Sequence, residues 1–310
     1  MHAFEHGAVM WDVARPRRTS RLAGVGMAGF RVRDLAPLRI VPHPAVTLFL
    51  DFGAGSPVLD DNRGQQRGSL VTGPGLGAGG AVRAWGQDLE CIQVRLSPVI
   101  ARAVLGSSTA DLDGAAVPLD DMWGRGEASR LCERLADLSS WQERFALVDA
   151  LLARRREAGP PVEPEVAQAW HRIVVSHGAV RVGSLAAEVG WSRKRLWSRF
   201  CSQLGLPPKQ AGKLVRFDRA VHRLVAGEEA ARVSADAGYA DQSHLHRDVM
   251  AFTGSTPAKM VEEPFLTVDD IAWPPPGPPT SAVPPHAVTP APPTWPKARL
   301  RASGEASGHL

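Results

Sequence analysis

Two short stretches in the second half of the chain carry basic, amide, hydroxyl and imidazole side chains at spacings that would place them on one face of a helix. The residues are Arg193, Lys194, Trp197 and Ser198 in the first stretch, and Gln242, Ser243, His244, His246 and Arg247 in the second. Arg and Lys can donate hydrogen bonds to guanine or to phosphate oxygens, Gln can pair with adenine, and Ser and His suit several partners. For either stretch alone, a solvated helix face is the alternative interpretation.

The two stretches belong to two copies of one pattern, which suggests two copies of one task. The copies read LAAEVGWSRKRLWSRFCSQLGLPPK from Leu185 and VSADAGYADQSHLHRDVMAFTGSTPAK from Val233. In each copy a helix with a small residue runs into a glycine, an aromatic residue, a polar cap and a second helix. The small residue lets two helices approach closely, and glycine supplies the turn conformation that a Cβ disfavours. The pattern therefore predicts two helix-turn-helix units.

The second helix of each unit has an apolar stripe. The stripe residues are Leu196, Phe200 and Leu204 in the first copy, and Leu245, Val249 and Phe252 in the second. Because these positions recur at helical spacing, one face turns toward a core and the polar face is left exposed.

A third helix is predicted between the copies, over Lys209 to Ala226, with Pro207 and Pro208 at its start. Its 18 residues would make a rod of roughly 27 Å. Such a rod could set two recognition helices near one turn of DNA apart, ~34 Å. Basic residues dominate from Arg193 to Arg223, with Asp218 as the single acid. Phosphate neutralisation is the simplest use of this charge, with Lys209, Lys213 and Arg216 as the expected phosphate contacts.

The region from about Glu165 to Met260 resembles the DNA-binding domain of the AraC/XylS family of bacterial transcription regulators, most closely in GYADQSHLHRDVMAFTGSTP. Leu245 and Val249 depart from the phenylalanines usual in the family. The resemblance implies homeodomain-like helix-turn-helix units that bind double-stranded DNA, and a regulator, such as an activator, that contacts RNA polymerase. The operator is not implied because base-facing residues vary across the family, and activation and repression both stay open.

The first half of the sequence is predicted to form an α+β domain. Strands are expected over Ala45 to Gly53 and Glu90 to Pro98, where Ile92, Val94 and Leu96 alternate with polar residues. Helices are expected from Ser97-Pro98 to Gly106, over Glu127 to Leu138 and over Ser140 to Arg156. The family resemblance implies a barrel-like sheet plus helices that senses a small-molecule effector or mediates formation of a homodimer.

Composition changes mark the expected boundaries. We predict an effector-sensing or dimerisation domain at 1–157, a linker with the sequence AGPPVEP at 158–164, a DNA-binding domain at 165–262 and a Pro-rich disordered tail at 263–310. Disorder is expected above all from Trp273 to Leu310, because proline runs hold neither helix nor strand.

The remaining features argue against other classes of protein. The chain has 310 residues, 44% of them hydrophobic, and a net charge of +4; it shows neither a signal peptide nor an apolar run of ~20 residues. A cytoplasmic protein with no membrane association is expected. Cys91, Cys132 and Cys201 are widely separated, which favours buried thiols in a reducing compartment.

No catalytic, metal or cofactor site is predicted. The glycine-rich GPGLGAGG at Gly73 to Gly80 lacks the features of a phosphate loop, and His2 and His6 lie at an unpatterned end of the chain. The sequence also disfavours two other classes of protein. A DNA-repair enzyme that carries a similar DNA-binding domain would need a reactive cysteine with ligands near it, and an interaction protein that binds no DNA would leave the basic face idle.

Overall fold

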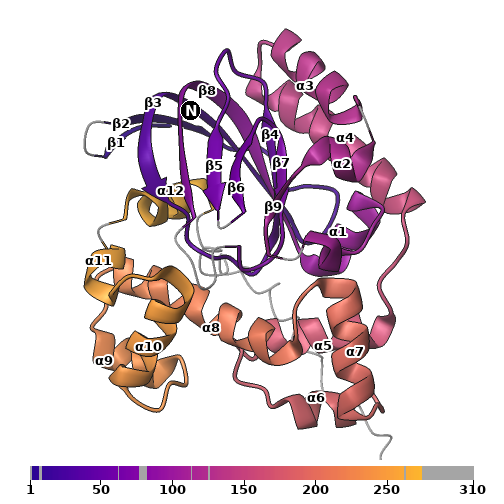
Figure 1. The fold of residues 1–310 in the computed structure, drawn as a ribbon, viewed down its shortest axis with the longest axis vertical. Coiled ribbons are helices and arrows are strands. Elements are labelled where there is room, and N and C mark those ends of the chain that lie inside the picture. The colour runs from indigo at the N-terminus through magenta and orange to yellow at the C-terminus, as the bar shows by residue number, and fades with distance from the viewer. Residues whose placement is uncertain are drawn as a thin grey trace, which may run out of the picture. The chain divides into compact units, whose positions relative to one another are not determined.

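The computed structural model describes residues 2–6, 9–61, 63–76, 82–112, 114–124, 126–261 and 263–273 (Figure 1). Three of the features interpreted from the sequence lie partly or wholly outside these residues: the end of the glycine-rich segment at 77–80, the side chains of His2 and His6, and the predicted tail from 274 to 310.

The N-terminal half is built on one curled antiparallel sheet (Figure 1). In the described residues its strand order is β1-β2-β3-β8-β4-β7-β9, with the β5–β6 hairpin joined to β8. The strands are β1 (His2–His6), β2 (Val9–Ala14), β3 (Val25–Arg39), β4 (Val46–Asp51), β5 (Val58–Asp61), β6 (Gly64–Arg67), β7 (Leu70–Thr72), β8 (Arg83–Leu96) and β9 (Ala116–Pro118). β3 and β8 pair along most of their length, with a register shift between Leu35 and Leu38.

Helices cover one face of this sheet. They are α1 (Pro98–Leu105), the 3-10 helix η1 (Thr109–Leu112), α2 (Leu119–Trp123), α3 (Glu127–Asp137) and α4 (Trp141–Ala158). Ile92, Val94 and Leu96 of β8 pack in one core with residues of α1, α3 and α4. The predicted α+β domain with a barrel-like sheet is confirmed, and α1 starts after Ser97 and ends at Gly106 in a left-handed conformation, as expected.

The other face of β8 is buried as well. Gln93 and Arg95 alternate with the apolar residues, which usually indicates a solvated face, yet they are only 6% and 7% exposed. Trp11, Phe30 and other residues of β2 and β3 form a second apolar cluster on this inner side of the curled sheet.

The C-terminal half is helical. Its elements are α5 (Pro164–Val175), α6 (Val182–Glu188), α7 (Arg193–Leu204), α8 (Pro208–Val225), α9 (Ala230–Asp236), α10 (Gln242–Thr253), α11 (Pro257–Val261) and α12 (Pro264–Ala272). The connecting helix predicted over 209–226 is α8, displaced by one residue.

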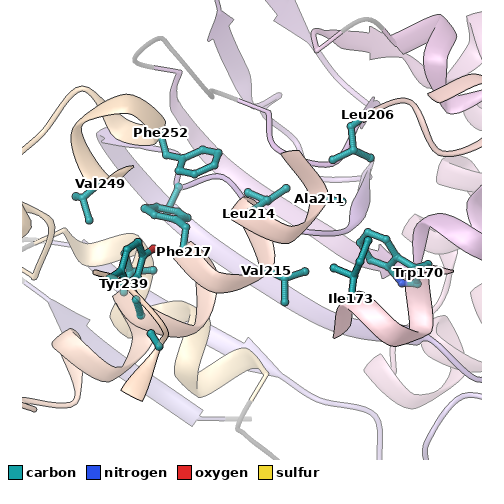
Figure 2. Close-up of a cluster of buried hydrophobic side chains, with 14 of the residues drawn as sticks. Trp170, Ile173, Leu206, Ala211, Leu214, Val215, Phe217, Tyr239, Val249 and Phe252 are labelled. Atoms are coloured by element: carbon teal, nitrogen blue, oxygen red, sulfur yellow. The ribbon is translucent and has the colours of Figure 1, made fainter. Parts of the chain in front are cut away.

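The central helix α8 supplies side chains to both ends of one core. Figure 2 shows Ala211 of α8 beside Trp170 and Ile173 of α5, and Phe217 of α8 near Phe252 of α10. The rings of Phe217 and Phe252 lie 4.7 Å apart between centroids. The two helix-turn-helix units therefore share a hydrophobic core through α8.

The prediction that a disordered tail begins at residue 263 is wrong for its first ten residues. Pro264 suits a first helical turn, and α12 follows, with Leu266, Val268 and Ala272 buried. Trp273 was also predicted to be disordered, but its ring lies 3.7 Å from the Arg95 guanidinium carbon. The physical reason is that 265–273 still carries apolar side chains, and the proline runs start only at 274.

Acidic residues of α12 and α8 meet two histidines in a polar cluster. His222 Nδ1 lies 2.7 Å from an oxygen of Asp270, while its Nε2 lies 3.4 Å from Asp269 and 3.7 Å from Asp218. Burial alone would lower the pKa of His222, but these three carboxylates outweigh it and raise the pKa to about 9. Across the cluster, burial and the charge of Arg95 lower the pKa of His43 to about 4, although Asp218 lies 3.6 Å from its Nε2.

We expect these histidines to place the maximum of stability near neutral pH. Because the pKa of His222 is raised on folding, its stabilising contribution is complete below its unfolded pKa, near 6.5, and is lost as pH rises through about 9. Between about pH 6.5 and 8, below the range in which the thiols titrate, the free energy of unfolding should thus fall by at most about 1.4 kcal/mol per pH unit. Urea titrations across this range measure it, and His222→Asn should abolish the slope. An equal slope in the variant would contradict the assignment.

Candidate nucleic-acid interface

The first helix-turn-helix unit consists of α6, a glycine turn and α7. Gly190 has a φ of 69°, a left-handed conformation that favours glycine, and the Trp191 amide donates to the Ala186 carbonyl at 2.9 Å. Ser192 then caps α7, since its hydroxyl accepts from the Arg195 amide at 3.2 Å. The turn is thus hydrogen-bonded to Ala186, the small residue of the first helix in the predicted pattern.

The second unit repeats this construction with α9 and α10. Gly238 has a φ of 74°, and the Tyr239 amide donates to the Ser234 carbonyl at 3.0 Å. Asp241 caps α10 by accepting from the His244 amide at 2.6 Å. The prediction of two helix-turn-helix units is confirmed, with one more residue between glycine and cap in the second copy than in the first.

On α7 the predicted base-facing residues form an exposed row. Arg193, Lys194, Trp197 and Ser198 are all exposed, whereas Leu196 and Phe200 are buried in the shared core. Trp197 is 55% exposed, which is unusual for an indole. The face therefore combines two cations, a hydroxyl and an aromatic surface.

On α10 the predicted residues divide into two groups. Gln242, Ser243, His246 and Arg247 are exposed, and Arg247 Nε donates to the Ser243 carbonyl at 3.3 Å along the helix surface. His244 is half-buried instead. Its ring meets the Tyr239 ring edge-on at 5.2 Å, and its Nδ1 lies 3.4 Å from the Ala240 amide.

The three predicted phosphate contacts also have different surroundings. Lys209 is exposed at the start of α8. Lys213 Nζ lies 3.4 Å from an oxygen of Asp248, a carboxylate that is only 5% exposed. Arg216 lies over the Tyr239 ring at 4.9 Å and donates to the Gly238 carbonyl at 3.3 Å. Lys213 and Arg216 therefore attach α8 to the second unit, a role that sequence reasoning missed.

Acids from outside the basic run neutralise part of it. Arg223 donates to both oxygens of Glu228 at 2.8 and 2.5 Å and to Asp236 at 2.8 Å. Arg199 pairs with Glu163, which precedes α5. These acids lie outside residues 193–223, and the i, i+5 spacing of Arg223 and Glu228 is the one local sequence signal of such a pair.

The cysteines do not form an activated site. Burial raises the pKa of Cys91 to about 12 and also raises the pKa values of Cys132 and Cys201. A thiol that stays protonated at neutral pH is a poor nucleophile, which disfavours a repair enzyme. Within the described residues no three His, Cys, Asp or Glu side chains are arranged so that they could hold a metal ion, and no helix there is long and apolar enough to cross a bilayer.

A family model described as a helix-turn-helix domain matches residues 185–263. This span begins within α6, continues through α7, α8, α9, α10 and α11, and ends directly before α12. Residues 185–263 are an AraC-type helix-turn-helix domain. The AraC/XylS prediction is thereby confirmed for this domain, and the coarse function of a DNA-binding transcription regulator follows from it.

Several solved structures show a distant likeness to the chain. ToxT from Vibrio cholerae shares 9% identity over 77% of this chain and 98% of that one, with a TM-score of 0.45. The C-terminal domain of AraT, a response regulator from Geobacillus stearothermophilus, shares 18% identity over 32% of this chain and 85% of that one, with a TM-score of 0.31. The AraC-like transcriptional activator CuxR shares 13% identity over 76% of this chain and 90% of that one, with a TM-score of 0.28. No curated protein matches the chain.

Two lysines of the AraC-type domain should respond differently to truncation. Lys213→Ala leaves the buried Asp248 carboxylate without its ion-pair partner, so we expect a loss of about 1–3 kcal/mol in the free energy of unfolding. Lys209→Ala removes an exposed cation and should change stability by less than about 0.5 kcal/mol. Urea denaturation measures both. Equal stabilities for the two variants would show that the Lys213–Asp248 pair does not hold α10 on α8.

Proposed function

We propose that the chain is a sequence-specific transcription regulator that reads two successive major grooves, one with α7 and one with α10. The observation that carries this proposal is the repeated unit itself. Both copies place a capped 12-residue helix with one buried and one polar face directly after a glycine turn. A second helix presented in this way is the element that helix-turn-helix proteins insert into the major groove.

The spacing of the units supports simultaneous binding. α8 has 18 residues and hence a length of roughly 27 Å, close to one turn of B-DNA at ~34 Å. Because its side chains belong to the core of both units, α8 resists bending between them. Two weak contacts on one rigid body would then bind together, which raises affinity without further contacts.

The surroundings of the predicted residues suggest which of them contact DNA and which position α10. Arg193, Lys194, Ser198, Gln242, Ser243, His246 and Arg247 are the proposed base and phosphate contacts, and Trp197 offers an apolar surface to a thymine methyl or a sugar. Lys209 is proposed as a phosphate contact. His244, Lys213 and Arg216 are proposed to act mainly by positioning α10, since each already contacts protein groups.

The N-terminal domain is proposed to modulate DNA binding by sensing a small molecule or by forming a homodimer. An apolar cavity of about 90 Å³ on the inner side of its sheet supports the first possibility. Contact with RNA polymerase and action in the cytoplasm complete the proposal. It requires no catalysis and no cofactor.

Binding should depend steeply on salt. Neutralising several phosphates releases counterions, so the affinity for operator DNA should fall roughly tenfold or more between 50 and 200 mM salt. Fluorescence anisotropy with an operator taken from a genome-wide binding map measures this. An affinity that is constant over the range would rule out phosphate neutralisation by the basic face.

Arg247 and Lys209 separate base reading from phosphate contact. If Arg247 reads a guanine, Arg247→Ala should weaken binding to the preferred operator by ~1–3 kcal/mol and relax preference at one base position. Lys209→Ala should weaken all sequences by a similar factor and reduce the salt dependence. Selection of preferred sites from random DNA with both variants measures the difference. Wild-type base preference and affinity in Arg247→Ala would reject the role of Arg247.

A further inference from the structure

Helix α12 follows the AraC-type domain in sequence but packs on both halves of the chain. Val268 and Ala272 lie in the apolar cluster on the inner side of the sheet, with Phe30 of β3. Leu266 belongs instead to the core that the helix-turn-helix units share. Contacts of α12 with β2, β3 and α8 agree with this two-sided packing (Figure 1).

A buried carboxylate on α12 joins the same two halves. Asp269 is 4% exposed, and both of its oxygens accept hydrogen bonds from the Arg95 guanidinium on β8. One of these oxygens also lies 3.4 Å from His222 Nε2 on α8. Because a buried charge is costly without its partner, these contacts are lost or kept together.

The two helix-turn-helix units are attached to the N-terminal domain at separate places. The first unit is held near α1, where the Ser108 hydroxyl donates to the Ser202 carbonyl at 2.6 Å and the Thr109 hydroxyl donates to the Gln203 carbonyl at 3.2 Å. The second unit is held through Arg39, which donates to the Thr253 carbonyl, and through α12, which contacts α8 at His222, in the part of α8 that packs on α9 and α10. Release of α12 would therefore loosen mainly the second unit.

The same helix closes the apolar cavity of the sheet. Phe265, Val268 and Trp273 form one wall, and Trp11, Phe30 and Cys91 are among the residues of the opposite side. The cavity of about 90 Å³ is smaller than ordinary ligand sites, which measure roughly 300–1,000 Å³. Side chains of α12 and Trp273 thus occupy space on the apolar face that a ligand of ordinary size would need.

The closed arrangement also leaves polar groups unsatisfied. The indole N–H groups of Trp11 and Trp273 and the Nε of Arg95 are buried without hydrogen-bond partners among the described residues. Each such donor weakens the closed state relative to one in which water reaches it. Docking of α12 therefore combines apolar contacts, which stabilise it, with unsatisfied buried donors, which destabilise it, as expected for an element that opens.

We propose that α12 with Trp273 is a reversible latch. Docked, it closes the apolar cavity and holds the second helix-turn-helix unit on the N-terminal domain; released, it opens the cavity and frees that unit. The latch consists of contacts within the chain, so it does not depend on which DNA sequence the domain reads.

Cys91 provides a probe of the latch, since it lines the cavity that α12 closes. In a chain carrying Cys132→Ser and Cys201→Ser, the rate of Cys91 modification by N-ethylmaleimide at fixed pH reports opening. Trp273→Ala and Asp269→Asn should each raise this rate about tenfold or more, because local opening becomes more frequent. The matched control is Glu157→Gln, which removes one exposed negative charge from α4 and leaves the contacts of α12 in place; its rate should stay within about twofold of the parent chain.

The latch would be overturned by a Trp273→Ala variant that keeps the thermal transition of its parent and whose Cys91 reacts with N-ethylmaleimide at the parental rate. Hydrogen exchange on the wild-type chain keeps the proposal testable if these variants do not fold. Amides of 265–272 should exchange together, through an opening of lower free energy than that of β8 and α8. Exchange of α12 only together with β8 and α8, in global unfolding, would equally overturn it.

Discussion

The C-terminal half depends on the packing of one helix, α8, against helices on both of its sides. A helix-turn-helix unit is too small to bury a sufficient core alone, because short chains bury a small share of their apolar surface. α8 solves this by giving Ala211 to the side of α5 and Phe217 to the side of α10. Each unit is thereby completed by the same rod that separates it from the other, so the stability and the spacing of the units have one origin.

Polar contacts then set the orientation that apolar packing leaves free. Hydrophobic contact is non-directional, whereas the Lys213–Asp248 ion pair and the stacking of Arg216 on Tyr239 fix how α10 turns about its axis on α8. Arg95 and Asp269 have the same effect on α12. The exposed row on α10 faces outward because Asp248, on its other side, is held inward.

Local features of the fold could be predicted from the sequence, and long-range pairs could not. Gly190 and Gly238 sit in tight turns where a left-handed residue is required, and the caps Ser192 and Asp241 act within three residues. Each of these signals is complete within a short window. By contrast, the partner of Arg95 is 174 residues away, and nothing in β8 indicates which acid neutralises it. The composition of 263–310 wrongly predicted disorder from residue 263 onward for a related reason. The average composition of this segment is set by the proline runs, whereas the nine residues of α12 near its start form a helix because they pack on an apolar surface that is distant in the sequence.

Long-range pairing also decides which cations are available to bind DNA. Within the basic run, Arg199 and Arg223 are paired with acids that lie outside it, and Lys213 is paired with a buried one. No ion pair within the described residues involves Arg193, Lys194 or Lys209, all of which are exposed. A cation that is already paired gives up a protein contact to reach a phosphate, whereas an unpaired one gives up only water and counterions. The proposed electrostatic attraction of the domain for DNA should accordingly be concentrated at the start of α7 and the start of α8. On α10, by contrast, the proposed contacts are hydrogen bonds from Gln242, Ser243 and His246 and the exposed guanidinium of Arg247.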